Sequence, residues 1–309
     1  MSARETVQDP QLDRARSLHA GAVLVLGLAG LGVVGGLAAT GARPTFGDVH
    51  VFLLFTIPTA LGATIGYHRH FAHRSFTAGP WVRGVLAILG SMCMQGPVIF
   101  WAALHRRHHQ NTDTAGDPHS PHVDDQGRPH RSKLHGLWHS YIGWTFVHEI
   151  PNSAHYVPDL LRSPSLMLIN RLYPVWVVMG LLLPTLLGGV LTASWQGALA
   201  AFAWGGALRI IFWHHMTWFI TSIAHVLGSR DLASSDQSRN NFLMALPTLG
   251  ESWHNNHHTF PTSAHAGLAW WQLDPSGWVI SAMASLNLIA NVKRPTQEAI
   301  ELKRRKRRA

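Results

Sequence analysis

Long apolar stretches separated by short polar links dominate the hydrophobicity pattern of this chain. A transmembrane helix needs about 20 mostly apolar residues. Residues 20–42 and 49–67 meet this requirement without a charged side chain. A short link around Arg43 and Pro44 joins the two stretches, so we expect them to form a helical hairpin.

A second hairpin is expected further along the chain. Residues 172–208 are uncharged and long enough for two helices, which we place at 172–190 and 196–220. The natural turn between them lies at Gly188–Gly189 or at residues 192–195, where small and turn-forming residues gather. The pattern therefore predicts about four transmembrane helices in two hairpins.

Residues 84–104 are also uncharged, but they are a weaker candidate for a span. Ser91 and Gln95 are polar, and Gly96–Pro97 would break a helix. We expect this segment to lie in the plane of the membrane or to dip in and out of it. Residues 278–292 are apolar but too short to span, and they predict a helix packed on a cap.

These elements predict an all-α integral membrane protein with a helical cap on one side. The predicted parts are a polar N-terminal arm (1–17), a membrane domain (18–295) whose cap comprises 105–165 and 225–295, and a basic C-terminal tail (296–309).

Composition supports a membrane protein. Of 309 residues, 47% are hydrophobic and 13% are charged, whereas a soluble domain carries about 25% charged residues. The net charge of +9 is concentrated in the last seven residues, which favours an orientation signal or a lipid contact over nucleic-acid binding. The positive-inside rule then places both termini and the cap in the cytoplasm.

Histidine is the unusual residue here, with 22 copies against 16 acidic residues and one cysteine. A single cysteine excludes a disulfide framework and a thiolate-built metal site. Three histidine clusters stand out: one at His68, His70 and His73, and two with the pattern H-x-x-H-H, at His105, His108 and His109 and at His254, His257 and His258.

The repeated H-x-x-H-H spacing predicts metal binding. On a helix, residues three and four apart lie on one face, so each triplet can present all three imidazoles together. His68 and His73 are five apart, about 140° around an ideal helix, and share a centre only if the helix ends or bends. Geometry alone leaves His68 and His70 as alternatives.

The three clusters build one site only if they lie on the same side of the membrane, which is why residues 84–104 should not cross it. Neutral imidazoles without thiolates suit iron, zinc, copper or nickel. Eight to ten histidines are too many for one ion and about right for two.

The three boxes, in this order and with these spans, resemble those of the integral-membrane fatty acid desaturases, specifically the delta-9 acyl-CoA type. Flanking residues add to the resemblance, including Trp101, Thr112–Asp113, Asp117–Pro118–His119, Gly250–Glu251 and Phe260–Pro261. The resemblance implies two iron ions, molecular oxygen as co-substrate and a long saturated acyl chain that receives a cis double bond.

The resemblance also implies a ligand set. His225 corresponds to a ninth ligand, in a motif where Thr221 replaces an asparagine that holds a metal-bound water. By the family pattern the ligands are His68, His73, His105, His108, His109, His225, His254, His257 and His258. The remaining histidines, including His70 and His119, are expected to be structural, to contact a ligand histidine without binding the metal, or to lie at the surface.

Two features bear on substrate and partners. Glu149 stands where animal members carry a basic pair that contacts CoA, so CoA, lipid and other carriers remain open. The matching region ends near residue 295 with no fused haem domain after it, so we expect a separate ferredoxin- or haem-type electron donor with its reductase. We expect no nucleic-acid partner.

Supporting residues can also be proposed. Metal-bound histidines usually donate their second N–H to an acceptor, and the candidates are Asp113, Asp117, Asp236 and Glu251. Met92, Trp101, Trp213 and Trp218 are candidates for the wall of an acyl tunnel. The alternatives are a hydroxylase on the same scaffold and, less favoured, a metal-binding or transport protein, since the clusters lie at span ends rather than within spans.

Overall fold

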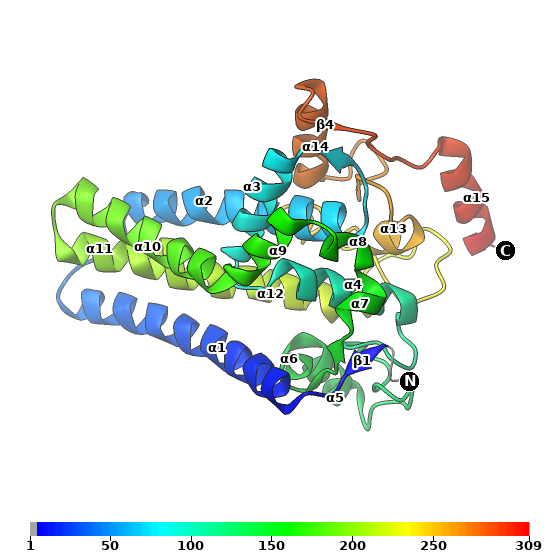
Figure 1. Ribbon diagram of the computed structural model, residues 1–309, viewed down its shortest axis with the longest axis horizontal. Helices are drawn as coiled ribbons and strands as arrows, with labels where there is room; N and C mark the ends of the chain where they lie inside the picture. The colour runs from blue at the N-terminus through cyan, green and yellow to red at the C-terminus, as the bar shows by residue number, and fades with distance from the viewer. Residues whose placement is uncertain (1–4, 309) are drawn as a thin grey trace.

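Helices form almost all the regular structure of the computed structural model, which describes residues 5–308. Within this range, three helices are long and apolar enough to cross a membrane. They are α1 (Pro10–Ala39), α2 (Phe46–Leu61) continued by the π-helix η1 (Gly62–Ala72), and α10 (Tyr173–Thr192). All three run roughly along the long axis of the molecule in Figure 1. The predicted helical membrane fold is confirmed, and the chain is a multi-pass membrane protein.

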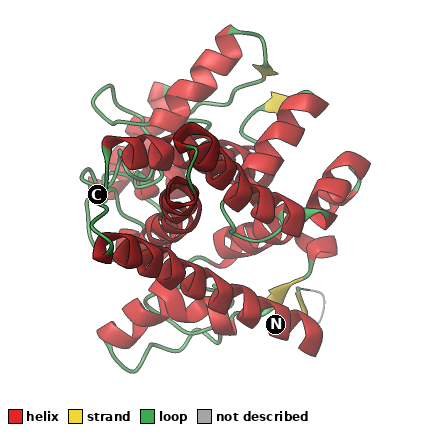
Figure 2. Cartoon of the chain, turned by 90° about the vertical axis from the view of Figure 1, so that its left-hand side faces the viewer, coloured by secondary structure: helices red, strands yellow, loops and turns green. Residues whose placement is uncertain are grey.

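The fourth predicted span differs from the other three. It is built from α11 (Trp195–Ala201), η3 (Phe202–Leu208) and α12 (Arg209–Thr221). It is not among the helices apolar enough to span, since Arg209 and two histidines interrupt it. Its η3 segment packs against α1, α2 and α10, among the helices seen nearly end-on in Figure 2. Arg209 is buried there and donates to the carbonyl oxygens of Gly180 and Met92.

The N-terminal arm is more structured than its polar composition predicts. Asp9 caps α1 by accepting a hydrogen bond from the Gln11 N–H at 2.8 Å, and Pro10 occupies the first turn. The helix therefore begins ten residues before the predicted start of the span. Strand β1 (Thr6–Val7) pairs antiparallel with β3 (Ile150–Pro151), and residues 1–4 lie outside the described residues.

The turn of the second hairpin lies at Ala193–Ser194, and α10 continues through Gly188. A Cβ on Gly188 would lie 2.3 Å from the Cβ of Ala201 on α11. This glycine therefore serves close helix packing rather than the turn.

Residues 84–104 contain parts of two helices rather than one continuous helix. Helix α3 (Pro80–Ser91) ends before a turn in which Met94 and Gly96 have positive φ, and α4 begins at Val98 after Pro97. Neither helix is long enough to cross a bilayer alone.

The remaining elements form the cap, which gathers at the end of the bundle opposite the α10–α11 turn (Figure 1). They are α5 (Lys133–Trp138), η2 (His139–Gly143), α6 (Trp144–Val147), α7 (Ser153–Tyr156), α8 (Pro158–Leu161), α9 (Pro164–Arg171), η4 (Ile223–His225), α13 (His254–Thr259), α14 (Pro275–Ser285), α15 (Gln297–Arg308) and the paired strands β2 (Thr77–Ala78) and β4 (Ile289–Ala290). The basic tail is thus helical, and both described ends lie at the cap.

Candidate metal centre

All nine histidines predicted as ligands meet in two groups at the cap end of the bundle. In each group the candidate ligand atoms lie within 4.8 Å of one another. Centre A contains His68, His73, His105, His109 and His257, and centre B contains His108, His225, His254 and His258.

Each H-x-x-H-H box contributes to both centres. In the box on α4, the first and last histidines belong to centre A and His108 belongs to centre B. In the box on α13 the assignment is reversed, and His257 belongs to centre A. The three histidines of each box therefore do not share one metal ion. Each box supplies ligands to both centres.

The π-helix η1 explains how His68 and His73 reach the same centre. A π-helix pairs residues five apart, and the His73 N–H donates to the His68 carbonyl oxygen at 3.1 Å. In place of the 140° offset expected for an ideal α-helix, the two imidazole rings lie with their centroids 4.8 Å apart. His70 points elsewhere, because its Nδ1 donates to the Phe76 carbonyl oxygen at 3.2 Å.

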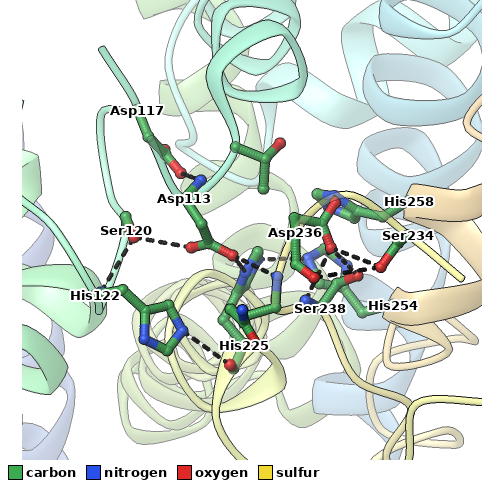
Figure 3. Close-up of polar contacts among 12 residues, drawn as sticks. Asp113, Asp117, Ser120, His122, His225, Ser234, Asp236, Ser238, His254 and His258 are labelled. Carbon is green, nitrogen blue, oxygen red and sulfur yellow. Dashed lines mark hydrogen bonds and ion pairs between the residues drawn. The ribbon is translucent and has the colours of Figure 1, made fainter. Parts of the chain in front are cut away.

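Four carboxylates hold the outer nitrogens of four of these histidines. Glu251 lies 2.6 Å from Nδ1 of His68, Asp117 2.9 Å from that of His108, Asp113 3.0 Å from that of His225 and Asp236 2.8 Å from that of His258. Figure 3 shows the contacts of Asp113 and Asp236. These are the four acids named from the sequence, and each contact leaves Nε2 facing a centre.

For most of the ligand histidines the electrostatics favour the neutral form that metal binding requires; His225 is the exception, because Asp113 outweighs burial and raises its pKa. Burial acts to raise the pKa of Asp117, but His108 outweighs it and lowers that pKa to about 2. Burial lowers the pKa of His258 to about 4, although Asp236 opposes this effect. Neutral imidazoles beside ionised carboxylates are the form that binds a metal ion.

The inner nitrogens fit bound cations. The Nε2 atoms of His73 and His105 lie 2.7 Å apart, and those of His225 and His254 lie 2.9 Å apart. The Nε2 atoms of His108 and His258 are buried without a hydrogen-bond partner. Buried polar atoms normally have partners, so two first-row metal ions, one at each centre, would satisfy this donor set.

An arginine inside the first box anchors this arrangement, although the spacing of the box gives no sign of it. Arg69 is buried and donates to Glu251 at 3.0 Å and to Asp274 at 2.8 Å. Asp274 caps α14. Arg69 therefore links the carboxylate behind His68 to the cap.

An arginine of the second box explains the acidic residue at position 149. The Nη2 of buried Arg107 lies 2.7 Å from a Glu149 carboxylate oxygen, and its Nη1 donates to the Glu149 carbonyl oxygen at 3.1 Å. Glu149 thus holds the cap onto α4.

A cavity of about 710 Å³ adjoins both centres and has a mostly apolar lining. His68, His105, His108 and His254 contribute to its wall, as do Trp101, Trp213 and Trp218. Trp101 stacks on His105, with ring centroids 5.0 Å apart and planes 14° apart. Gln95 accepts from Trp101 Nε1 at 3.3 Å and donates to Thr217 at 2.7 Å, which fixes this wall.

The structure does not support the roles expected for two residues, Met92 and Thr221. The described residues that line the cavity do not include Met92. The carbonyl oxygen of Met92 instead accepts a hydrogen bond from buried Arg209. The Thr221 hydroxyl lines the cavity but donates to the Ser140 carbonyl oxygen at 2.8 Å. Its proton is therefore directed at the backbone, and the water-holding role has no support from this contact.

Other cavity residues were not expected. His119 lines the cavity beside His108, with ring centroids 4.1 Å apart, and its buried Nδ1 has no hydrogen-bond partner. Val7, Leu12 and Arg16 add part of the N-terminal segment to the wall. The Asp117–Pro118–His119 motif is a sequence feature that could have indicated His119. The polar composition of the N-terminal segment gave no indication that Val7, Leu12 and Arg16 line the cavity.

Comparison with known proteins agrees with this geometry. A sequence profile described as fatty acid desaturase matches residues 47–285. The chain belongs to the fatty acid desaturase family. It is similar to a hex-5-enoyl-[acyl-carrier protein] acetylenase of Moorena producens, with 47% identity over 79% of this chain and 76% of the relative.

Two further relatives show how much substrates vary within the family. An sn-1 stearoyl-lipid 9-desaturase of Synechocystis sp. is 36% identical over 81% of this chain and 72% of its own length. An acyl-CoA C20 Delta5-desaturase of Anemone leveillei is 32% identical over 80% and 73%. The chain is therefore an oxidoreductase of this family, and its histidine groups are consistent with the di-iron centre of desaturases.

Proposed function

We propose that this protein is an oxygen-dependent desaturase of fatty acyl chains. The observation that carries the proposal is the apolar cavity whose wall includes ligand histidines of both centres. Iron ions held at centres A and B would supply, with molecular oxygen, the oxidising power to remove hydrogen from unactivated methylene groups.

The chain's own residues bind and orient the substrate. The apolar cavity wall favours an acyl chain over water. Trp101 fixes His105 by stacking, and the Gln95 bridge from Trp101 to Thr217 holds the wall in one shape. The fixed wall determines which methylene pair lies beside the ions, and the position expected from the family resemblance is delta-9. The 9-desaturase relative supports this position.

The carrier of the acyl chain is also part of the proposal. The relatives act on chains attached to a carrier protein, a lipid or CoA, according to their names. Glu149 binds Arg107 and leaves no basic pair at that position. We therefore favour a lipid or carrier-protein chain over acyl-CoA.

A second candidate activity is conversion of an existing double bond to a triple bond. The 47% identity with an acetylenase favours it. Both activities remove one hydrogen from each of two adjacent carbons, so the same centre serves either.

The cap and both termini are proposed to lie in the cytoplasm, because the basic residues of α15 lie at the cap end of the bundle. A separate ferredoxin- or haem-type donor would supply electrons there.

Expression of the full chain in a host that lacks desaturases tests the proposal. Saturated and mono-unsaturated chains should be supplied as lipids, and the products located by mass spectrometry. New double bonds in wild type, absent from His108→Ala and present in the exposed control His155→Ala, are expected. A hydroxylated product, or no new product with intact iron, would overturn the assignment.

A further inference from the structure

A strongly basic helix, α15, lies on the outside of the cap. Residues 303–308 of α15 are all Lys or Arg. Ile300 is 4% exposed and anchors the helix, and the Lys303 carbonyl oxygen accepts from the Ala233 N–H at 3.1 Å. The side chains of Arg305, Lys306 and Arg307 are exposed.

The segment that contacts α15, residues 228–239, also backs centre B. Asp236 in this segment holds Nδ1 of His258, and the Gln237 N–H donates to Asp113 at 2.8 Å. The same oxygen of Asp113 holds His225. Figure 3 shows Asp236 beside His258 and Asp113 beside His225. Two of the four histidines of centre B are thus supported through the segment that α15 contacts.

The cavity opens elsewhere. Among the described residues, its lining includes none from 228–239 and none from α15. A partner bound on this surface would leave the acyl cavity free, which favours an electron carrier over an acyl carrier.

A lipid surface fits α15 less well than a protein does. An interfacial helix buries a substantial apolar face, whereas Leu302 is the one exposed large hydrophobic residue in the described part of α15. In Figure 1, α15 lies beyond α13, at the opposite end of the molecule from the α10–α11 turn.

We propose that α15 and residues 228–239 form a docking surface for an acidic one-electron carrier protein, with Asp236 and His258 as the route to centre B. The inference rests on the proposed function, because desaturation consumes electrons. The substrate gives two electrons and two protons to O2. Two carriers, each oxidised by one electron, and two protons from solvent complete its reduction to two waters.

The test uses an acidic plant-type ferredoxin and the purified full chain in detergent. The variant Arg305→Glu/Lys306→Glu/Arg307→Glu reverses the exposed charges of α15. The matched control Arg128→Glu/Arg131→Glu/Lys133→Glu reverses three exposed charges elsewhere on the cap. Ferredoxin oxidation with substrate and O2 is measured at low and high salt, and the same turnover is measured with a small dye as reductant.

We expect the α15 variant to oxidise ferredoxin about 10- to 100-fold more slowly at low salt, with a weaker salt dependence, while dye-driven turnover and the control stay within about twofold of wild type. The proposal would be overturned by an unchanged rate of ferredoxin oxidation in the α15 variant, or by an equal loss of that rate in the control. It would also be overturned if the α15 variant lost binding to anionic vesicles but still oxidised ferredoxin normally. Calorimetric binding of oxidised ferredoxin tests the docking surface independently of the desaturase function. Wild type without product from either reductant contradicts the desaturase function, even if ferredoxin binding depends on α15.

Discussion

The two histidine centres are built by different means. Centre A has five imidazoles, which lie on η1 or directly after it, on α4 and on α13, and one of them, His68, is held by a carboxylate. Centre B has four imidazoles, three of which are held by carboxylates from loops. Centre A thus depends on helix geometry and ligand number, whereas centre B depends on its supporting carboxylates. The predictions below test this difference.

Removing one ligand from each centre should have the largest effect. His108→Ala leaves centre B with three imidazoles, while His257→Ala leaves centre A with four. We expect product formation to fall by more than about 100-fold in both variants. This loss exceeds the roughly 10- to 100-fold that is typical when a residue hydrogen-bonded to a ligand is replaced. Iron content should fall further in His108→Ala, from about two ions to about one. Equal metal loss in both variants would contradict the proposed asymmetry.

Removing a supporting carboxylate should weaken centre B without removing a ligand. Asp236→Asn keeps the size of the side chain but removes the charge beside His258. We expect a loss of about 10- to 100-fold in metal affinity, measured by chelator competition. Asp124→Asn, which changes a carboxylate of the 112–132 loop that pairs with exposed Arg128, is the control and should bind metal normally.

Acidification should destabilise the metal-free protein. Burial holds the pKa of His254 and His257 well below the ordinary value and that of His258 at about 4, whereas in the unfolded chain these groups titrate near about 6.5. Between these values the unfolded state binds more protons, so the free energy of unfolding falls as pH decreases.

His225 opposes this trend, because Asp113 outweighs burial and raises its pKa, but it is outnumbered. Thermal unfolding in detergent should therefore show a lower Tm at pH 5.5 than at pH 7.5. A Tm that rises on acidification would contradict the assignment of these histidines as buried groups with a lowered pKa.

Disturbing the π-helix should affect centre A through packing. A Cβ on Gly62 would lie 2.4 Å from the backbone nitrogen of Gly90 on α3. Gly62→Ala should cost about 1–3 kcal/mol of stability, as overpacked sites do, and reduce metal at centre A before centre B. Gly35→Ala on α1 adds a Cβ into open space and should leave Tm and metal content unchanged or slightly raise Tm.

Thr221→Val should have the smallest effect. The lost hydroxyl donates to a backbone carbonyl oxygen, so we expect a cost of about 1 kcal/mol and unchanged iron content. A clear loss of iron in this variant would instead support the water-holding role.

The sequence predicted the helical membrane fold and the gathering of the histidines, because hydrophobic run length and residue spacing are local properties. The helix break at Gly96–Pro97 could be predicted for the same reason, because proline interrupts a helix through its own backbone geometry. The π-helix was not predicted, and its first residue, Gly62, packs closely against the backbone of α3, a contact that only the tertiary fold creates. The sharing of each box between two centres also required the tertiary fold.

Other differences have similar causes. Polar composition made the N-terminal segment look like a free arm, whereas its pairing with β3 and its place in the cavity wall depend on residues far along the chain. The arginines of the first two boxes, Arg69 and Arg107, are buried on carboxylates far away in the sequence, which no local pattern indicates. The nine-ligand set stays a prediction, which the observed grouping supports.

Iron-edge anomalous diffraction from crystals of the iron-loaded full chain tests the central claim most directly. The account predicts two peaks, one within bonding distance of the five imidazoles of centre A and the other of the four of centre B. A single peak, or two peaks that each bind one complete H-x-x-H-H box, would contradict it.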